Sequence, residues 1–401
     1  MSWLVAVTAL AIMSVSYGAP LVAVVGLKPI AADLGSLRSA AALAGSLAWL
    51  GSAVGGIFMA RIAERIGVRW TVMTGALMIG AGLALSSRGG IWQIYLGHGV
   101  LIGLLGNGGI NAPLYVYVSH WFDRRRGTAL ALISSGQYVA GTLWPSVFER
   151  SIGHFGWRST MLLFGVAVCA IVVPASLLLR RPPHAALHVA AALGARPGDT
   201  ILGLRPALLI AVLSLASFCC CVPMSMPQGH LVAYCSDLGI LPSHGAAMLS
   251  VLLGTAFLSR QMWGWISDRI GGLRTVLAAS ACQAATLFAF LVTQDEIGLF
   301  AVSAAFGLGF AGIIPAYVLA IRELFPAVEA ARRIPVLLLS SGSGMAAGGW
   351  LAGVIYDHAG FYAPAFATGI AFNAANLCII FWLTTRRRRF TPAARGLRQP
   401  A

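Results

Sequence analysis

The sequence predicts an all-α integral membrane protein with twelve membrane-spanning helices in two six-helix halves. Three observations lead to this fold class. Hydrophobic residues make up 58% of the chain and charged residues 10%, against about 25% charged in soluble domains. The apolar residues fall into runs that are long enough to cross a bilayer. A short charged motif also recurs about 200 positions later in the chain, which indicates that the second half repeats the first.

Each apolar run is interpreted as a helix, because an isolated segment in lipid must satisfy its own backbone hydrogen bonds. The first six runs lie near residues 4–27, 40–60, 70–87, 91–118, 128–148 and 159–179. The second six lie near 207–235, 245–266, 275–293, 297–321, 335–356 and 363–385. We therefore expect an N-terminal half (1–180), a linker (181–206), a C-terminal half (207–385) and a basic tail (386–401).

The orientation in the membrane follows from the arginines. Alternate loops differ in their content of Arg and Lys, and the richer set lies on the side of both termini, together with the Arg386–Arg389 run. Basic residues accumulate on the cytoplasmic side of membrane proteins, so we expect both termini to be cytoplasmic. The first apolar run is longer than the core of a signal peptide and should stay as a spanning helix.

Several classes of function are disfavoured. The net charge of +15 comes mainly from arginines between apolar runs, which set topology, so no nucleic-acid partner is expected. The seven cysteines lack the paired spacing of a metal site, and we expect neither a metal nor a cofactor. No nucleophile–base pair or phosphate-binding loop indicates an enzyme.

The repeated motif is Glu64-Arg65-Ile66-Gly67 in the first half and Asp268-Arg269-Ile270-Gly271 in the second. Both copies lie in the loop between the second and third runs of their half. An acidic residue with neighbouring arginines at helix ends can latch two halves in one conformational state. The alternative is a basic loop that only sets topology. The candidate latch comprises Glu64, Arg65, Arg69, Asp268, Arg269 and Arg274.

At these residues the chain resembles the major facilitator superfamily. Gly264-Trp265-Ile266-Ser267-Asp268-Arg269-Ile270-Gly271 closely matches the signature loop of that family, whereas the first copy has Ala60 and Glu64 in place of glycine and aspartate. The resemblance implies an alternating-access carrier with its substrate site between the halves near the membrane midplane.

Within that superfamily the chain is similar to the monocarboxylate transporters and oxalate/formate antiporters over essentially its whole length. The resemblance is carried by Ser16-Tyr17-Gly18, the stretch from Tyr117 to Gly127, Phe155-Gly156-Trp157-Arg158, the stretch from His230 to Tyr234, and Arg260. It implies that Arg260 binds the substrate carboxylate. Ala256 and Leu21 replace an acidic residue and a lysine of the animal relatives, and run 335–356 lacks the second cation of the antiporters.

Arg260 is also the most informative residue on physical grounds. It is a lone cation in an apolar run that holds no carboxylate, and a central arginine costs roughly 2.5–3.5 kcal/mol to insert. A guanidinium can hold a carboxylate through two parallel hydrogen bonds. The alternative is an arginine bound to backbone carbonyls at a helix break. One fixed cation favours a monoanion over a dianion, because a second buried charge would lack a partner.

Further site candidates are polar groups on spans expected to face the cavity. By the family resemblance, tyrosines of the fourth and tenth spans surround the anion. Ordinary packing is the alternative for these tyrosines, and interhelical hydrogen bonding explains the amides equally well. The candidates are Tyr115, Tyr317, Tyr17, Asn111 and His230, with further amides at Asn107, Gln137 and Asn373.

Proton coupling would need a titratable group in the membrane. His98 and His230 are the only ionisable side chains besides Arg260 that lie well within the runs. Coupling would therefore use a histidine, the substrate's own protonation or exchange for a counter-anion, and His230 is a candidate for an outer gate. Lys28, at the outer end of the first run, is expected to extend to the membrane surface.

The sequence as a whole favours a secondary carrier for small organic monoanions, such as monocarboxylates, in a bacterial cytoplasmic membrane. The short loops and the bacterial character of the resemblance favour that membrane. We expect a monomer surrounded by lipid, with a proton or a counter-anion as a possible second substrate. One alternative is an exporter of drugs or lipophilic compounds with the same fold, and a less favoured one is a membrane sensor that transports nothing.

Overall fold

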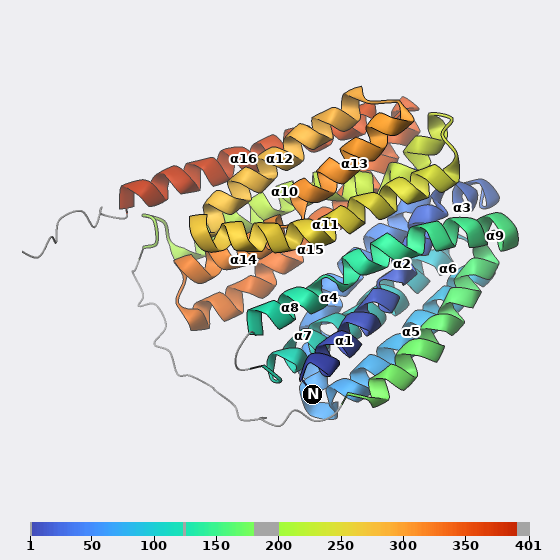
Figure 1. Cartoon of the computed structure of the whole chain (residues 1–401), viewed down its shortest axis with the longest axis horizontal. Coiled ribbons are helices and arrows are strands. Elements are labelled where there is room, and N and C mark those ends of the chain that lie inside the picture. Colours follow the sequence, from blue (N-terminus) through green and yellow to red (C-terminus); the bar gives the residue numbers. More distant parts are fainter. Residues whose placement is uncertain (1, 123–125, 180–199, 391–401) are drawn as a thin grey trace, which may run out of the picture.

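The computed structural model describes residues 2–122, 126–179 and 200–390, and these residues form a bundle of long helices (Figure 1). The helices of the first half are α1 (Ser2–Ser16), α2 (Gly18–Val25), α3 (Leu27–Asp33), α4 (Arg38–Ile66), α5 (Val68–Arg88), α6 (Ile91–Tyr95), the π-helix η1 (Leu96–Asn107), α7 (Gly108–Ser119), α8 (Arg126–Ser134) and α9 (Gly136–Leu177). Those of the second half are α10 (Pro206–Asp237), α11 (Pro242–Ile270), α12 (Gly272–Val292), α13 (Glu296–Phe310), α14 (Ile313–Leu324), α15 (Ala327–Ala359) and α16 (Ala363–Phe390).

The described residues contain ten helical segments that are long and apolar enough to cross a membrane. One of them, Ala129–Leu177, holds two spans, because Gly156 breaks α9 with a φ of 77°. The twelfth span is α11, which lies in the same bundle and contains Arg260, Asp268 and Arg269. The predicted all-α fold with two six-helix halves is therefore confirmed.

The glycines of the repeated motif have the same structural role in both halves. Gly67 follows α4 with a φ of 92°, and Gly271 follows α11 with a φ of 81°. Residues with side chains rarely adopt this region, whereas glycine does so without steric cost. Each glycine ends one span and allows the next to begin at the following residue, so the duplicated sequence forms the same sharp turn in both halves.

The two halves lie side by side in Figure 1, the first in blue to green and the second in yellow-green to red. They meet mainly through α4 with α15 and α9 with α11, and α10 also contacts α2 and α3. The helices pack closely there: a Cβ added at Gly141 of α9 would lie 2.1 Å from Leu253 Cδ1 of α11. Small residues thus allow close packing between the halves.

The predicted domain boundaries fall partly outside the described residues. Positions 181–199 of the expected linker and 391–401 of the expected tail are not described, and α10 begins at Pro206. Arg386 to Phe390 continue α16 as helix. We call the end of the bundle with Lys28, Arg38 and Asp237 the distal end. The opposite end, where α1 begins at Ser2 and α11 ends at Ile270, is the terminal end (Figure 1).

Candidate functional site

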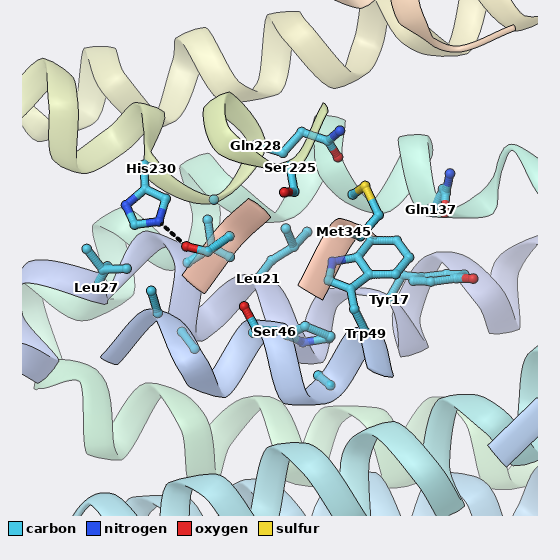
Figure 2. Close-up of a pocket in the computed structure, with 18 of the residues that line it drawn as sticks. Tyr17, Leu21, Leu27, Ser46, Trp49, Gln137, Ser225, Gln228, His230 and Met345 are labelled. Atoms are coloured by element: carbon cyan, nitrogen blue, oxygen red, sulfur yellow. Dashed lines mark hydrogen bonds between the residues drawn. The ribbon is translucent and has the colours of Figure 1, made fainter. Parts of the chain in front are cut away.

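A cavity of about 100 Å³ lies between the two halves (Figure 2). Helices α2, α3, α4, η1 and α9 of the first half line it, together with α10, α11 and α15 of the second. The residues that line it include no Lys, Arg, Asp or Glu. Its polar or partly polar side chains are Tyr17, Ser46, Trp49, Ser52, Asn107, Gln137, Tyr138, Ser225, Gln228 and His230.

Arg260 lies beyond the end of the cavity that Tyr17 and Tyr138 form. It follows the lining residue Leu253 by seven positions on α11, about 10 Å toward the terminal end at 1.5 Å per residue. Its guanidinium carbon is 5.3 Å from the centre of the Tyr138 ring, and Nη1 donates to the backbone oxygen of Ser134 at 3.2 Å. A guanidinium has five N–H donors, and no described carboxylate forms an ion pair with this one.

The structure brings three predicted site residues to Arg260. The hydroxyls of Tyr17 and Tyr115 lie within the electrostatic influence of the guanidinium, and Asn111 lies beside Tyr17. Tyr17 also lines the cavity. These side chains come from α7 and from the junction of α1 with α2, so a residue of the second half meets a polar cluster of the first half across the interface.

Tyr317, by contrast, lies inside the second half. Its side chain is fully buried, and its hydroxyl donates to Asn376 Oδ1. Asn376 Nδ2 donates in turn to Ser280 Oγ at 2.9 Å, and Tyr317 is absent from the residues that line the cavity. In this conformation it therefore belongs to a buried network that joins α12, α14 and α16, away from the cavity lining.

His230 lies at the distal end of the cavity, where Figure 2 shows its bond to the backbone. Nε2 is 2.7 Å from the carbonyl oxygen of Gly349, and Nδ1 is 3.0 Å from the hydroxyl of Tyr362. A carbonyl can only accept, so Nε2 carries a proton. The neutral ring then accepts the Tyr362 O–H at Nδ1.

Several cavity residues were expected, and others were missed. Asn107 and Gln137 were expected as intramembrane amides, and Asn107 Oδ1 is buried without a partner among the described groups. Trp49 and Gln228 were missed. The sequence gives one signal for Gln228, an amide between Pro227 and Gly229 in an otherwise apolar run, and none for Trp49, which resembles any tryptophan of a spanning helix.

The charged residues differ between the two ends. The six predicted latch residues at the terminal end are all exposed, and no ion pair joins any two of them in the part of the chain that is described. At the distal end, Asp237 of the second half pairs with Lys28 and Arg38 of the first. Lys28 was expected to extend to the membrane surface, but its Nζ donates to Asp237 Oδ1 at 3.0 Å.

Comparison with known proteins places this geometry in context. The family model described as Major Facilitator Superfamily matches residues 4–258 and 213–400. Monocarboxylate transporter 13 of Bos taurus is 25% identical over 328 residues, which cover 80% of this chain and 75% of that protein. The uncharacterized MFS-type transporter YcxA of Bacillus subtilis is 24% identical over 306 residues, 74% of each chain.

Among solved structures, the chain is similar to a bacterial homolog of the human lysosomal transporter Spinster in an inward-facing and occupied conformation. The TM-score is 0.69, the sequence identity is 15%, and the match covers 96% of each chain. At this identity the likeness concerns the fold.

Proposed function

The chain belongs to the major facilitator superfamily, as its sequence predicted, and we propose that this secondary transporter carries small organic monoanions such as monocarboxylates. In this proposal the two halves move relative to each other, so that the cavity between them opens to one side of the membrane and then to the other. Arg260 is the residue that pairs with the substrate carboxylate.

The observation that supports this role is the isolation of the Arg260 charge. The guanidinium lies between the halves, next to the Tyr138 ring and within the influence of the Tyr17 and Tyr115 hydroxyls, and no described carboxylate neutralises it. Its one backbone bond leaves donors that can bind an anion. A carboxylate beside it would gain charge-assisted hydrogen bonds that a neutral solute cannot make.

The cavity lining supports a small, singly charged substrate. A volume of about 100 Å³ and a lining of apolar side chains with neutral amides and hydroxyls suit a short organic tail. A second carboxylate would lie among groups that carry no positive charge, at a cost of several kcal/mol for an unpaired buried ion.

The membrane setting belongs to the same proposal. With both termini cytoplasmic, the terminal end faces the cytoplasm of a bacterium and the distal end faces outward. The paired charges at the distal end then describe a carrier closed to the outside. We propose that it acts as a monomer within the lipid, with a proton or a counter-anion as second substrate.

Uptake by purified protein in liposomes tests the proposal. A panel of labelled acids is supplied with and without a pH gradient to the wild-type protein, Arg260→Lys and Arg260→Ala. We expect uptake of monoanions to fall at least about 100-fold in Arg260→Ala, because a charge-assisted pair contributes roughly 3 kcal/mol. Arg260→Lys should keep part of the rate. Arg88→Ala, which removes an exposed arginine, is the matched control. Anion uptake that is unchanged in both Arg260 variants would refute the assignment.

The neutral cavity lining favours a second candidate function, export of drugs or lipophilic compounds. No lining residue carries a fixed charge, and Trp49, Tyr17 and Met345 offer apolar surface. The same liposomes separate the two functions: saturable movement of neutral or cationic compounds without any response to carboxylates would favour the exporter.

A further inference from the structure

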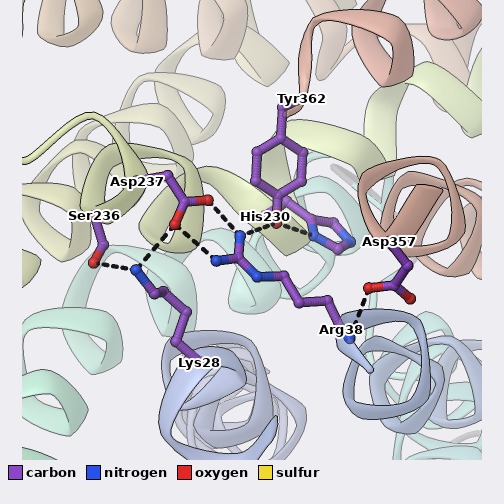
Figure 3. Close-up of polar contacts among 7 residues, drawn as sticks. All are labelled: Lys28, Arg38, His230, Ser236, Asp237, Asp357 and Tyr362. Carbon is purple, nitrogen blue, oxygen red and sulfur yellow. Dashed lines mark hydrogen bonds and ion pairs between the residues drawn. The ribbon is translucent and has the colours of Figure 1, made fainter. Parts of the chain in front are cut away.

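The distal end contains a carboxylate that is held by cations of the opposite half (Figure 3). Asp237 ends α10, and both of its oxygens face the guanidinium of Arg38 at the start of α4. Nη2 donates to Oδ1 at 2.7 Å, and Nη1 donates to Oδ2. Lys28 Nζ donates to Oδ1 as well, at 3.0 Å. A guanidinium that meets both oxygens of a carboxylate is the geometry with which proteins recognise carboxylate ligands.

The site is partly sheltered from water. The Arg38 side chain is 14% exposed and that of Asp237 is 22% exposed. The Tyr356 ring covers the guanidinium, with its centre 3.8 Å from Cζ. Reduced solvent contact strengthens the attraction between such charges relative to a fully exposed pair. The first half therefore supplies the two cations of this carboxylate site, and the second half supplies both the carboxylate that fills it and the ring that covers it.

The two halves contribute opposite charges to this cluster: its cations belong to the first half, and the carboxylate that binds them belongs to the second. The second half also contributes Asp357, but its oxygens accept the backbone N–H groups of Arg38 and Ser39 at 3.0 and 2.9 Å. It caps the first turn of α4 in this way. The nearby acid of the first half, Asp33, is bonded to Arg158 at 2.8 Å. When the halves separate at this end, Lys28 and Arg38 lose Asp237, whereas Asp33 has its own partner, Arg158, within the first half.

A chain of hydrogen bonds connects this cluster with the central cavity. Arg38 Nη1 donates to the Tyr362 hydroxyl at 3.2 Å, and that hydroxyl bonds His230 Nδ1 at 3.0 Å (Figure 3). His230 lines the cavity. Lys28 follows the lining residue Leu27, and Arg38 reaches the lining residue His230 through Tyr362, so both cations lie next to the distal side of the cavity.

We propose that Lys28 and Arg38 form an outer carboxylate-binding site whose ligand changes during transport. Asp237 fills the site while the distal end is closed, and the carboxylate of an arriving monoanion fills it when that end is open. The inference rests on the proposed function, because it names where the same substrate is first captured before it reaches Arg260.

Because Asp237 and the substrate compete for the same site, this inference predicts opposite changes in substrate affinity for two substitutions. Removing the Asp237 charge eliminates the internal competitor, so substrate from the distal side should bind more tightly. Removing the Arg38 charge eliminates the site itself, so substrate should bind less tightly. An ion pair that only locks the gate predicts the same change in both cases, because each substitution breaks the same bond and eases opening.

The experiment measures initial uptake of a labelled monocarboxylate that is supplied at the distal face of oriented liposomes. Arg38→Gln should raise the external KM about fivefold or more, as expected for loss of a charge-assisted contact. Asp237→Asn should lower the external KM. The matched control is Arg158→Gln, which breaks an arginine–aspartate pair at the same end but within one half, and its KM should equal that of the wild type.

A shift of the external KM in the same direction for Arg38→Gln and Asp237→Asn would overturn the inference while leaving the proposed function intact. Wild-type liposomes that move no carboxylate would refute the proposed function instead. If Arg38→Gln elutes as an aggregate, Lys28→Gln replaces it, with a smaller rise of the external KM expected. An unchanged or lower KM in Lys28→Gln would again count against the site.

Discussion

The two ends of the bundle use charge differently. At the distal end, Lys28 and Arg38 of the first half meet Asp237 of the second. At the terminal end, Asp268 and its repeat partner Glu64 are exposed, and no ion pair between the halves is seen there among the described residues. The terminal end carries more arginines than the distal end, so the number of charges does not explain why pairs between the halves form at the distal end.

Conformational state offers a physical explanation. Two rigid halves that rock about a central site cannot be in close contact at both ends at once, so charges at one end pair only when those at the other are apart. We therefore expect the terminal latch to form when the distal cluster is broken. The following predictions test whether the ends alternate in this way.

The largest effect is expected from blocking distal closure with Gly353→Leu. A Cβ at Gly353 of α15 would lie 2.7 Å from the Cα of Ser39 on α4, and backbone atoms cannot give way without moving the helices. Uptake in liposomes should fall at least about 100-fold, as for a barrier raised by roughly 3 kcal/mol. Gly153→Ala, at a glycine with open space around it, should transport normally. Normal uptake by Gly353→Leu would show that close contact of α4 with α15 is not needed for the cycle.

A second prediction compares the ends by stability. A double-mutant cycle with Arg38→Gln and Asp237→Asn should give a coupling energy of about 1 kcal/mol in the free energy of unfolding, because the pair is partly buried and bonded through both oxygens. The same cycle with Glu64→Gln and Arg269→Gln should give a value close to zero. Denaturation in detergent measures both. Equal coupling at the two ends would contradict the alternation.

The sequence predicted the terminal set of charges but missed the distal set, and the reason is geometric. Glu64 and Asp268 occupy matched positions 204 residues apart, so the repeat itself draws attention to them. The same offset from Lys28 and Arg38 leads to Val232 and Pro242. Their partner Asp237 lies 204 positions after Asp33, but Asp33 binds Arg158 of its own half. Only the packing of the halves brings Asp237 to Lys28 and Arg38.

The candidate site also contains some features that the sequence predicts and others that it does not. The twelve runs and the isolated charge of Arg260 could be predicted, because hydropathy and the cost of a charge in lipid are local properties of the sequence. The positions of Tyr115 and Tyr317 relative to the halves could not. Both are tyrosines in glycine-rich spans, yet one lies near Arg260 and the other is buried beside Asn376. Helix rotation decides between these outcomes, and a single sequence determines rotation poorly.

A smaller effect is expected from Tyr362→Phe. The substitution keeps the ring, which packs 4.6 Å from that of Tyr356, and removes only the hydroxyl between Arg38 and His230. Loss of one buried hydrogen-bonding group should lower the free energy of unfolding by about 1 kcal/mol or less. Thermal unfolding in detergent measures the change. A loss of several kcal/mol would mean that the hydroxyl, rather than the ion pair, holds the distal end closed.

The smallest effect on stability is expected at the terminal end, from Asp268→Asn. The side chain is exposed and pairs with no described residue of the other half, so the free energy of unfolding should change by less than about 0.5 kcal/mol. Transport should nevertheless slow, because the latch stabilises the opposite state and a carrier must visit both states in every cycle. The two measurements together separate a latch from a loop that only sets topology. A loop that only sets topology predicts that Asp268→Asn has normal stability and normal uptake. A loss of stability would mean that the Asp268 charge is already paired in the distal-closed state. Glu64→Gln should repeat the pattern of Asp268→Asn, because the two residues occupy equivalent positions in the duplicated halves.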